Sequence, residues 1–123
     1  MTWTAVCALD LLAVDRGAAA LVDGHQVAIF RLASGDVYAI DHRDPFSEAN
    51  VLARGLVGTR GDVPTVASPV YKQVFDLTTG RCLDDETVAV KSWPVRVVDG
   101  MVEIDASAVG GAGLVVEAAV GDG

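Results

Sequence analysis

The chain has 123 residues, of which 51% are hydrophobic and 21% charged, and its formal net charge is −8 at pH 7. This predicts one globular domain with a real core, and the negative charge argues against a nucleic-acid partner because it repels phosphate backbones. With no apolar run of about 18 residues and no secretory-signal pattern at the N-terminus, we expect no membrane association and a cytoplasmic location.

In chain order, short apolar runs separated by Gly, Asp and Ser predict an all-β fold. Leu11 and Leu12 are expected to sit on a single helical turn. Asp23-Gly24 is a strong hairpin signal, because its backbone readily takes positive φ. The first part of the chain is therefore predicted to hold a short strand and then a three-stranded meander, over residues 4–7, 18–22, 27–32 and 37–41.

From His42 onward the strand pattern breaks, and two loops are expected, over residues 42–55 and 68–72. Asp99-Gly100 predicts a final hairpin, with Val95, Val97, Val102 and Ile104 alternating onto one buried face. The other strands of this half are predicted over residues 56–58, 65–67, 74–77, 88–90, 94–98 and 101–105, with a turn over residues 61–64.

The chain divides into a predicted domain over residues 1–105 and an Ala/Gly/Val-rich C-terminal tail over residues 106–123. Residues 114–116 form an apolar island in that tail. Chain termini are usually loose, so one interpretation is a mobile tail. The other is a segment that docks on a partner or on a sheet edge.

The two loops contain Asp44-Pro45-Phe46 and Ser68-Pro69-Val70-Tyr71. Together with the strands around them, they resemble the cluster-binding loops of Rieske-type iron–sulfur proteins. The resemblance covers residues 2–105 and implies an all-β Rieske-like fold of antiparallel sheets. The chain most resembles the small subunit of the NAD(P)H-dependent assimilatory nitrite reductase. The segments that carry this resemblance are 43–47 (RDPFS), 49–52 (ANVL) and 68–73 (SPVYKQ).

This resemblance implies a non-catalytic subunit in nitrate assimilation. Its partner would be a large subunit that carries FAD, a [4Fe–4S] cluster and sirohaem and that reduces nitrite to ammonium.

A Rieske [2Fe–2S] cluster needs two Cys thiolates on one iron and two His imidazoles on the other. The corresponding positions here hold other residues: Asp44, Phe46, Ser68 and Tyr71. The two Cys and two His of the chain lie far apart in sequence, so we expect no metal and no cofactor in this chain. Ser68 has no His near it in sequence, and Ser-Pro favours a turn, so we expect no catalytic residues either.

Without a cluster, side chains must fill the space between the two loops, and Phe46 and Tyr71 are large enough to fill part of it. Asp44 and Ser68 could hydrogen-bond across it, and Arg43 could neutralise Asp44. The loops could instead form a docking surface for the large subunit, because aromatic and Arg side chains are frequent in binding hot spots. The residues proposed for that contact are Arg43, Phe46, Tyr71, Lys72 and Gln73. The alternatives are a Rieske-type ferredoxin-like electron carrier and a free-standing binding module.

Overall fold

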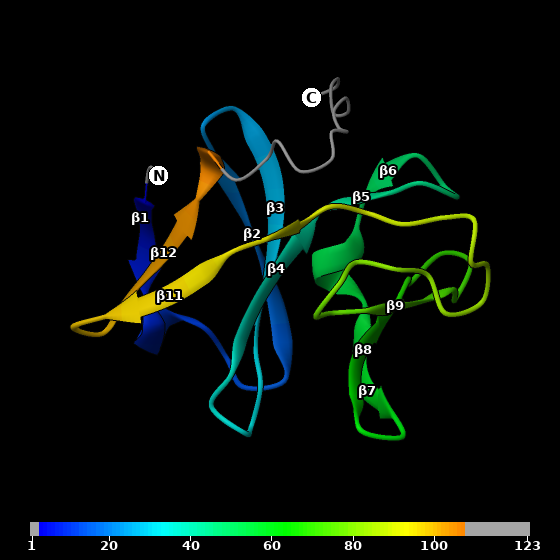
Figure 1. Cartoon of the computed structure of the whole chain (residues 1–123), viewed down its shortest axis with the longest axis horizontal. Helices are drawn as coiled ribbons and strands as arrows, with labels where there is room; N and C mark the ends of the chain where they lie inside the picture. The colour runs from blue at the N-terminus through cyan, green and yellow to red at the C-terminus, as the bar shows by residue number, and fades with distance from the viewer. Residues whose placement is uncertain (1–2, 108–123) are drawn as a thin grey trace.

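The computed structural model describes residues 3–107, and within them the fold is all-β, as predicted (Figure 1). Two short 3-10 helices, η1 (Leu9–Leu11) and η2 (Leu52–Arg54), interrupt the strands. The strands are β1 (Trp3–Ala8), β2 (Arg16–Val22), β3 (His25–Arg31), β4 (Val37–Asp41), β5 (Arg43–Asp44), β6 (Ala49–Asn50), β7 (Leu56–Arg60), β8 (Val63–Ala67), β9 (Val74–Asp76), β10 (Ser92–Trp93), β11 (Val95–Val98) and β12 (Met101–Asp105).

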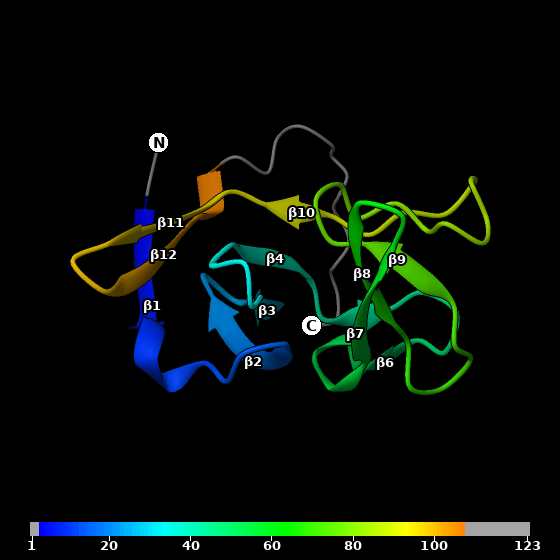
Figure 2. The same cartoon turned by 90° about the horizontal axis from the view of Figure 1, so that it is seen from below.

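The strands pair in four antiparallel sheets, with the orders β1-β12-β11, β10-β4-β3-β2, β5-β6 and β7-β8-β9. Figure 2 shows the four-stranded sheet between the other two large sheets. One end of the molecule therefore carries the β11–β12 hairpin. The other end carries the short strands and loops between β5 and β9 (Figure 1).

Both Asp-Gly pairs form the predicted tight hairpins. Val22 pairs with His25 across the first turn, and Val98 pairs with Met101 across the second. The two turn residues have φ of 51° and 83° in the first hairpin and 52° and 77° in the second. Two consecutive positive φ angles are typical of a type I′ turn, whose twist matches that of the flanking strands.

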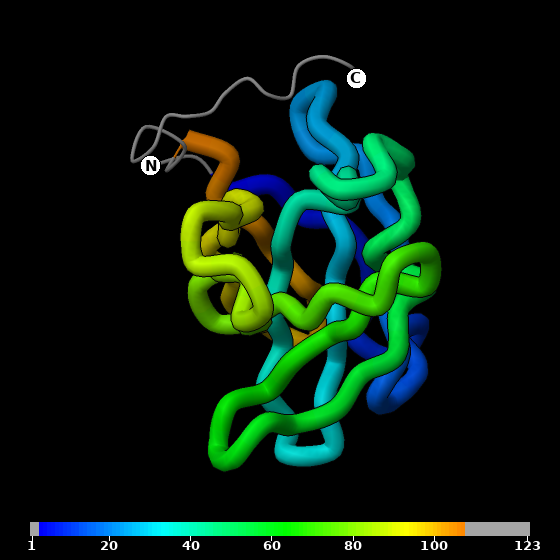
Figure 3. Tube along the Cα trace, turned by 90° about the vertical axis from the view of Figure 1, so that its right-hand side faces the viewer, coloured from blue at the N-terminus to red at the C-terminus, as the bar shows by residue number. Residues whose placement is uncertain are grey.

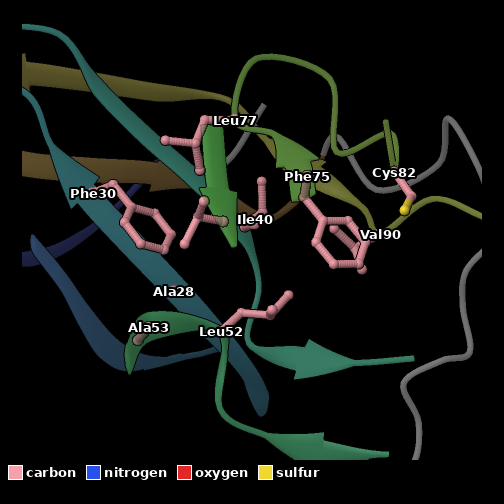
Figure 4. Packing of buried hydrophobic residues seen from close by; sticks show 10 residues of the cluster. Ala28, Phe30, Ile40, Leu52, Ala53, Phe75, Leu77, Cys82 and Val90 are labelled. Atoms are coloured by element: carbon pink, nitrogen blue, oxygen red, sulfur yellow. The ribbon is translucent and has the colours of Figure 1, made fainter. Parts of the chain in front are cut away.

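Strands β3 and β4 separate two hydrophobic cores. Successive side chains of a strand point to opposite faces, so β3 contributes Ala28 and Phe30 to the first core and Val27 and Ile29 to the second. The first core, shown in Figure 4, joins this sheet to β8, β9 and η2. The second core joins it to the β11–β12 sheet. Because both faces are covered, the sequence of β3 is apolar without interruption over residues 27–30.

Four predicted details of the strands were wrong. Residues 88–90 form no strand and contribute only an isolated bridge between Ala89 and Arg81. Pro64 lies inside β8 rather than in a turn, and Pro94 separates β10 from β11. Val97 is 42% exposed, because β11 is an edge strand that extends past the second core. The strands β5, β6 and β10 were not predicted, because a strand of two residues is too short to show an alternating pattern.

The predicted domain boundary lies at the end of β12, Asp105. The greater part of the predicted tail, residues 108–123, lies outside the described residues, and so does its apolar island. Within residues 3–107, no helix is both long and apolar enough to cross a membrane.

Candidate functional site

The first loop is organised around the buried carboxylate of Asp44. β5 and β6, with two residues each, form a short hairpin in which Asp44 pairs with Ala49. The Asp44 side chain is fully buried, and it accepts hydrogen bonds from Phe46 N at 2.9 Å and from Ser47 Oγ at 3.0 Å. An Asp side chain that accepts from the backbone two residues later forms an Asx turn, and Pro at the next position favours that turn. The Asp-Pro-Phe-Ser sequence thus folds the loop locally.

The second loop is tied to the first through Ser68, which follows β8. Ser68 is fully buried, and its hydroxyl donates to Asp44 Oδ2 at 2.5 Å. The backbone then closes the loop, because Ser68 O accepts from Lys72 N at 3.1 Å and Ser68 N donates to Gln73 O at 2.9 Å. The predicted hydrogen bond between Asp44 and Ser68 is therefore present. We call the hydrogen bond between Asp44 and Ser68 the loop bridge.

The two aromatic residues of the loops behave differently. Phe46 is half-buried and packs against the first core, with its ring centroid 6.2 Å from that of Phe75. Tyr71 is 58% exposed. The expectation that Tyr71 fills the space between the loops was therefore wrong, because the loop closes through Ser68 and leaves the ring of Tyr71 outside.

The described ion-pair partner of Arg43 is Glu48, at 4.0 Å, rather than Asp44 as expected. Arg43 is exposed, whereas Asp44 on the next position of β5 is buried. Adjacent residues of a strand point to opposite faces, so Arg43 lies on the solvent side of the loop. An exposed pair at this distance contributes little to stability.

His42 lies next to the first loop, but its ring takes part in local structure. It is buried, and its Nδ1 accepts a hydrogen bond from Ala53 N at 3.1 Å. Burial lowers the pKa of His42, and the charge of Arg54 adds to this. Through this hydrogen bond the neutral ring of His42 holds η2, which follows the β5–β6 hairpin, in place.

The residues at the loops do not fit a Rieske cluster. That cluster needs thiolate and imidazole ligands. The loop positions supply one carboxylate, one aliphatic hydroxyl, one phenol and one phenyl ring, and the loop bridge already engages the carboxylate and the aliphatic hydroxyl. Among residues 3–107, no group of three or more His, Cys, Asp or Glu side chains is placed to hold a metal ion. Cys7 lies on β1, and Cys82 is buried in the first core.

A second, half-buried polar cluster lies where β4 pairs with β10. Asp41 Oδ1 accepts from Trp93 Nε1 at 3.0 Å, and the ammonium of Lys91 lies 3.5 Å from the centre of the Trp93 ring. Burial raises the pKa of Asp41 and lowers the pKa of Lys91. The ring of His25, at the start of β3, lies 5.3 Å from that of Trp93. The cluster could not be predicted from local sequence because Asp41 and Trp93 are 52 residues apart.

Two features near the loops were also missed. Val70 is 45% exposed beside Tyr71, and together they form an apolar pair on the loop surface. Ser47 is a hydrogen-bond donor to Asp44, which the three-residue spacing in Asp-Pro-Phe-Ser could have indicated. Figure 3 looks onto this end of the molecule.

The chain is similar to proteins of a known family. The family model described as the Rieske-like [2Fe–2S] domain matches residues 2–105. The nitrite reductase (NADH) small subunit of Salmonella typhimurium is 45% identical over 103 residues, which cover 83% of this chain and 95% of the relative. A solved structure described as a putative NADH-dependent nitrite reductase small subunit from Mycobacterium tuberculosis superposes with a TM-score of 0.81 at 48% identity, covering 84% of this chain and 93% of that chain.

A further relative is much longer than this chain. The nitrite reductase [NAD(P)H] large subunit of Klebsiella oxytoca is 48% identical over 101 residues. These residues are 81% of this chain, and they span only 10% of that large subunit.

Proposed function

The chain belongs to the Rieske-like [2Fe–2S] domain family and, within it, to the nitrite reductase (NADH) small subunits, and on this premise we propose that it works bound to a nitrite reductase large subunit. In this proposal the large subunit carries the FAD, the [4Fe–4S] cluster and the sirohaem, and it reduces nitrite to ammonium with electrons from NAD(P)H. The small subunit supports that enzyme in the cytoplasm and has no catalytic residue of its own.

The observation that carries this proposal is the match to the Klebsiella oxytoca large subunit. A stretch homologous to most of this chain occurs there within a single large-subunit polypeptide. A domain that is covalently joined in one protein and separate in a relative is expected to bind the same partner in both, because tethering raises its effective concentration at an existing contact. The same domain as a separate chain must then hold its partner by affinity.

We further propose that this chain transfers no electrons. The loop bridge occupies the two oxygen side chains that stand at the Cys positions of a Rieske site, and Phe46 and Tyr71, which stand at the His positions, supply no imidazole. In this proposal the loops present a contact surface instead. The exposed part of this tip surface consists of Arg43, Val70, Tyr71 and Lys72, and the half-buried Phe46 and Gln73 lie among them.

Three features support the tip surface as the contact. Val70 and Tyr71 expose apolar area, and Lys72 adds a positive charge to a chain of net charge −8, while Arg43 lies 4.0 Å from Glu48. The loop backbone is held by the loop bridge and by the bond from Lys72 N to Ser68 O, so these side chains start from a fixed position. A preorganised surface loses less entropy on binding. We expect the partner to offer an apolar recess with carboxylates at its rim.

Co-expression with the large subunit tests the role of the chain. We expect the two chains to co-purify in fixed proportion. We also expect nitrite-dependent oxidation of reduced nicotinamide to be higher when this chain is present than when the large subunit is purified alone. Separate elution of the two chains, with equal activity in both preparations, would contradict the small-subunit role and would favour a free-standing binding module.

A matched pair of valines tests the tip surface. Val70 is 45% exposed on the tip, and Val98 is 41% exposed in the β11–β12 hairpin at the opposite end of the molecule (Figure 1). Val70→Asp should weaken binding to the large subunit at least about tenfold, because a charge replaces an apolar contact. Val98→Asp should leave binding unchanged, and Tyr71→Ala should act in the same direction as Val70→Asp. Equal binding by both valine variants would refute the contact.

Iron analysis tests the absence of electron transfer. The protein is purified without oxygen after expression with added iron and sulfide, and its iron content and visible spectrum are measured. We expect no stoichiometric iron and no visible absorption band. Two irons per chain together with a reversible one-electron reduction would support the ferredoxin alternative.

A further inference from the structure

A groove runs between β1 and β2 on the side of the molecule away from the loops. It has a volume of about 340 Å³, and all ten residues that line it are apolar or cysteine, four of them alanines. Leu11 and Leu21 lie at its rim and are 77% and 71% exposed. Leu12 and Ile29 of its lining are buried members of the second core, so the groove is an opening into that core.

The groove lies between two strands that each end their sheet. β1 pairs only with β12, and β2 pairs only with β3, among the residues that the structure describes. β1 carries a bulge between Ala5 and Cys7, which disrupts its free edge. β2 pairs without interruption along its seven residues, and between Gly17 and Val22 it has no charge and no proline. A long, regular, apolar edge of this kind promotes aggregation unless something covers it.

The chain contains a segment with the pattern to cover this edge. Residues 114–120 read Leu-Val-Val-Glu-Ala-Ala-Val, so the alternate positions 114, 116, 118 and 120 are all apolar and the charged Glu117 falls on the other face. A period of two with β-branched residues is the pattern of a half-buried strand. The segment lies beyond the family match, which ends at residue 105.

The segment can reach the groove. Asp105, the last residue of β12, pairs with Trp3 of β1, so the chain leaves β12 beside the start of β1. From Trp3 to Cys7 is four residues along a strand, or about 13 Å. The six residues 108–113 can span about 20 Å, and three of them are glycines, which adapt to most backbone paths.

We propose that residues 114–120 bind the same chain's free β2 edge as an additional strand and place Leu114 and Val116 in the groove. The backbone of the segment would pair with the outward N–H and C=O groups of β2. Its apolar face would cover Leu21 and close the opening into the second core. This inference concerns the end of the molecule away from the tip surface, and it does not depend on the proposed function.

The two cysteines provide the test, because Cys7 lines the groove and Cys82 is 3% exposed in the first core. Docking should protect Cys7 from a small alkylating reagent, and Cys82 reports any general loosening of the fold. The matched variants are Val116→Asp and Val115→Asp in the full chain, with folding checked by far-UV circular dichroism. They place the same charge on adjacent residues of opposite predicted faces.

We expect Val116→Asp to raise the alkylation rate of Cys7 about tenfold or more, because it introduces a charge at a buried apolar position. Val115→Asp should change that rate less than about twofold, and Cys82 should stay protected in both. Hydrogen exchange should show the outward amides of β2 protected in the unmodified chain and exposed in Val116→Asp. No difference in Cys7 between the unmodified chain and Val116→Asp would overturn the proposal.

Two other results would also overturn it. Equal acceleration of Cys7 by both variants would exclude an alternating strand. Protection that disappears on tenfold dilution of the unmodified protein would show that the segment of a second copy, rather than the chain's own, covers the groove.

Discussion

The two ends of the molecule are held together by different means. At the loop end, a buried carboxylate with three hydrogen-bond donors joins segments that have little regular pairing of their own. At the strand end, β11, β12 and β1 are held by regular ladders over an apolar core in which Val102 and Ile104 are fully buried. Polar ordering depends on a few groups with defined geometry, whereas apolar packing distributes its stabilisation over many contacts.

The largest effect should come from removing the carboxylate of the loop bridge. Asp44→Ala leaves Phe46 N, Ser47 Oγ and Ser68 Oγ without their shared acceptor, and we expect the free energy of unfolding to fall by about 3 kcal/mol. Urea unfolding measures this fall in the free energy of unfolding. Asp85→Ala is the control, because Asp85 accepts two similar bonds from Thr87 in an exposed turn. Equal losses in the two variants would contradict the role of burial.

A smaller effect should follow from removing the other half of the loop bridge. Ser68→Ala should lower the free energy of unfolding by about 1.5 kcal/mol, since Asp44 keeps its bonds from Phe46 and Ser47. The double variant Asp44→Ala/Ser68→Ala should lose less than the sum of the single variants, because one bond is counted in both. A strictly additive pair would show that the bridge contributes nothing to stability.

At the strand end, a conservative apolar change should be milder still. Ile104→Val removes one methylene from the fully buried face of β12 and should cost about 1 kcal/mol. The same change should leave binding to the large subunit unaffected, because Ile104 belongs to the second core and not to the tip surface. Thermal unfolding and a binding titration together test this. A loss above that of Asp44→Ala would reverse the comparison between the two ends.

The smallest effect concerns the pH dependence that Asp41 contributes at the junction of β4 and β10. Burial raises its pKa above the ordinary 3.8, and Lys91 and His25 lie nearby with opposite charge. A raised carboxyl pKa means that folding favours the protonated form. Its contribution is therefore present below pH 3.8 and is lost as the pH rises through the raised value.

Asp41→Asn removes this titration. The free energy of unfolding of the unmodified protein minus that of Asp41→Asn should therefore fall as the pH rises from below 3.8 through the raised pKa of Asp41. Urea unfolding across this range measures the difference. A difference that is constant or rises with pH would contradict the assignment to Asp41.

Much of the fold could be predicted from local sequence. Asp23-Gly24 and Asp99-Gly100 specify their own turns, and the apolar run of β3 indicates a strand covered on both faces. The predicted strand over residues 88–90 failed because three apolar residues suit either a strand or a packed loop. Here Val90 and Val88 pack against the first core from a loop.

The sequence alone determined the all-β class, the two Asp-Gly hairpins and the unsuitability of the loop residues as Rieske ligands. These follow from residue chemistry and from spacing within a few positions. Only the tertiary structure decided that Asp44 and Ser68 meet, that Tyr71 faces outward and that Asp41, Lys91 and Trp93 form a cluster. Asp44 and Ser68 are 24 positions apart and Asp41 and Trp93 are 52 positions apart, so only folding brings them together, and the exposure of Tyr71 depends on which face its loop buries.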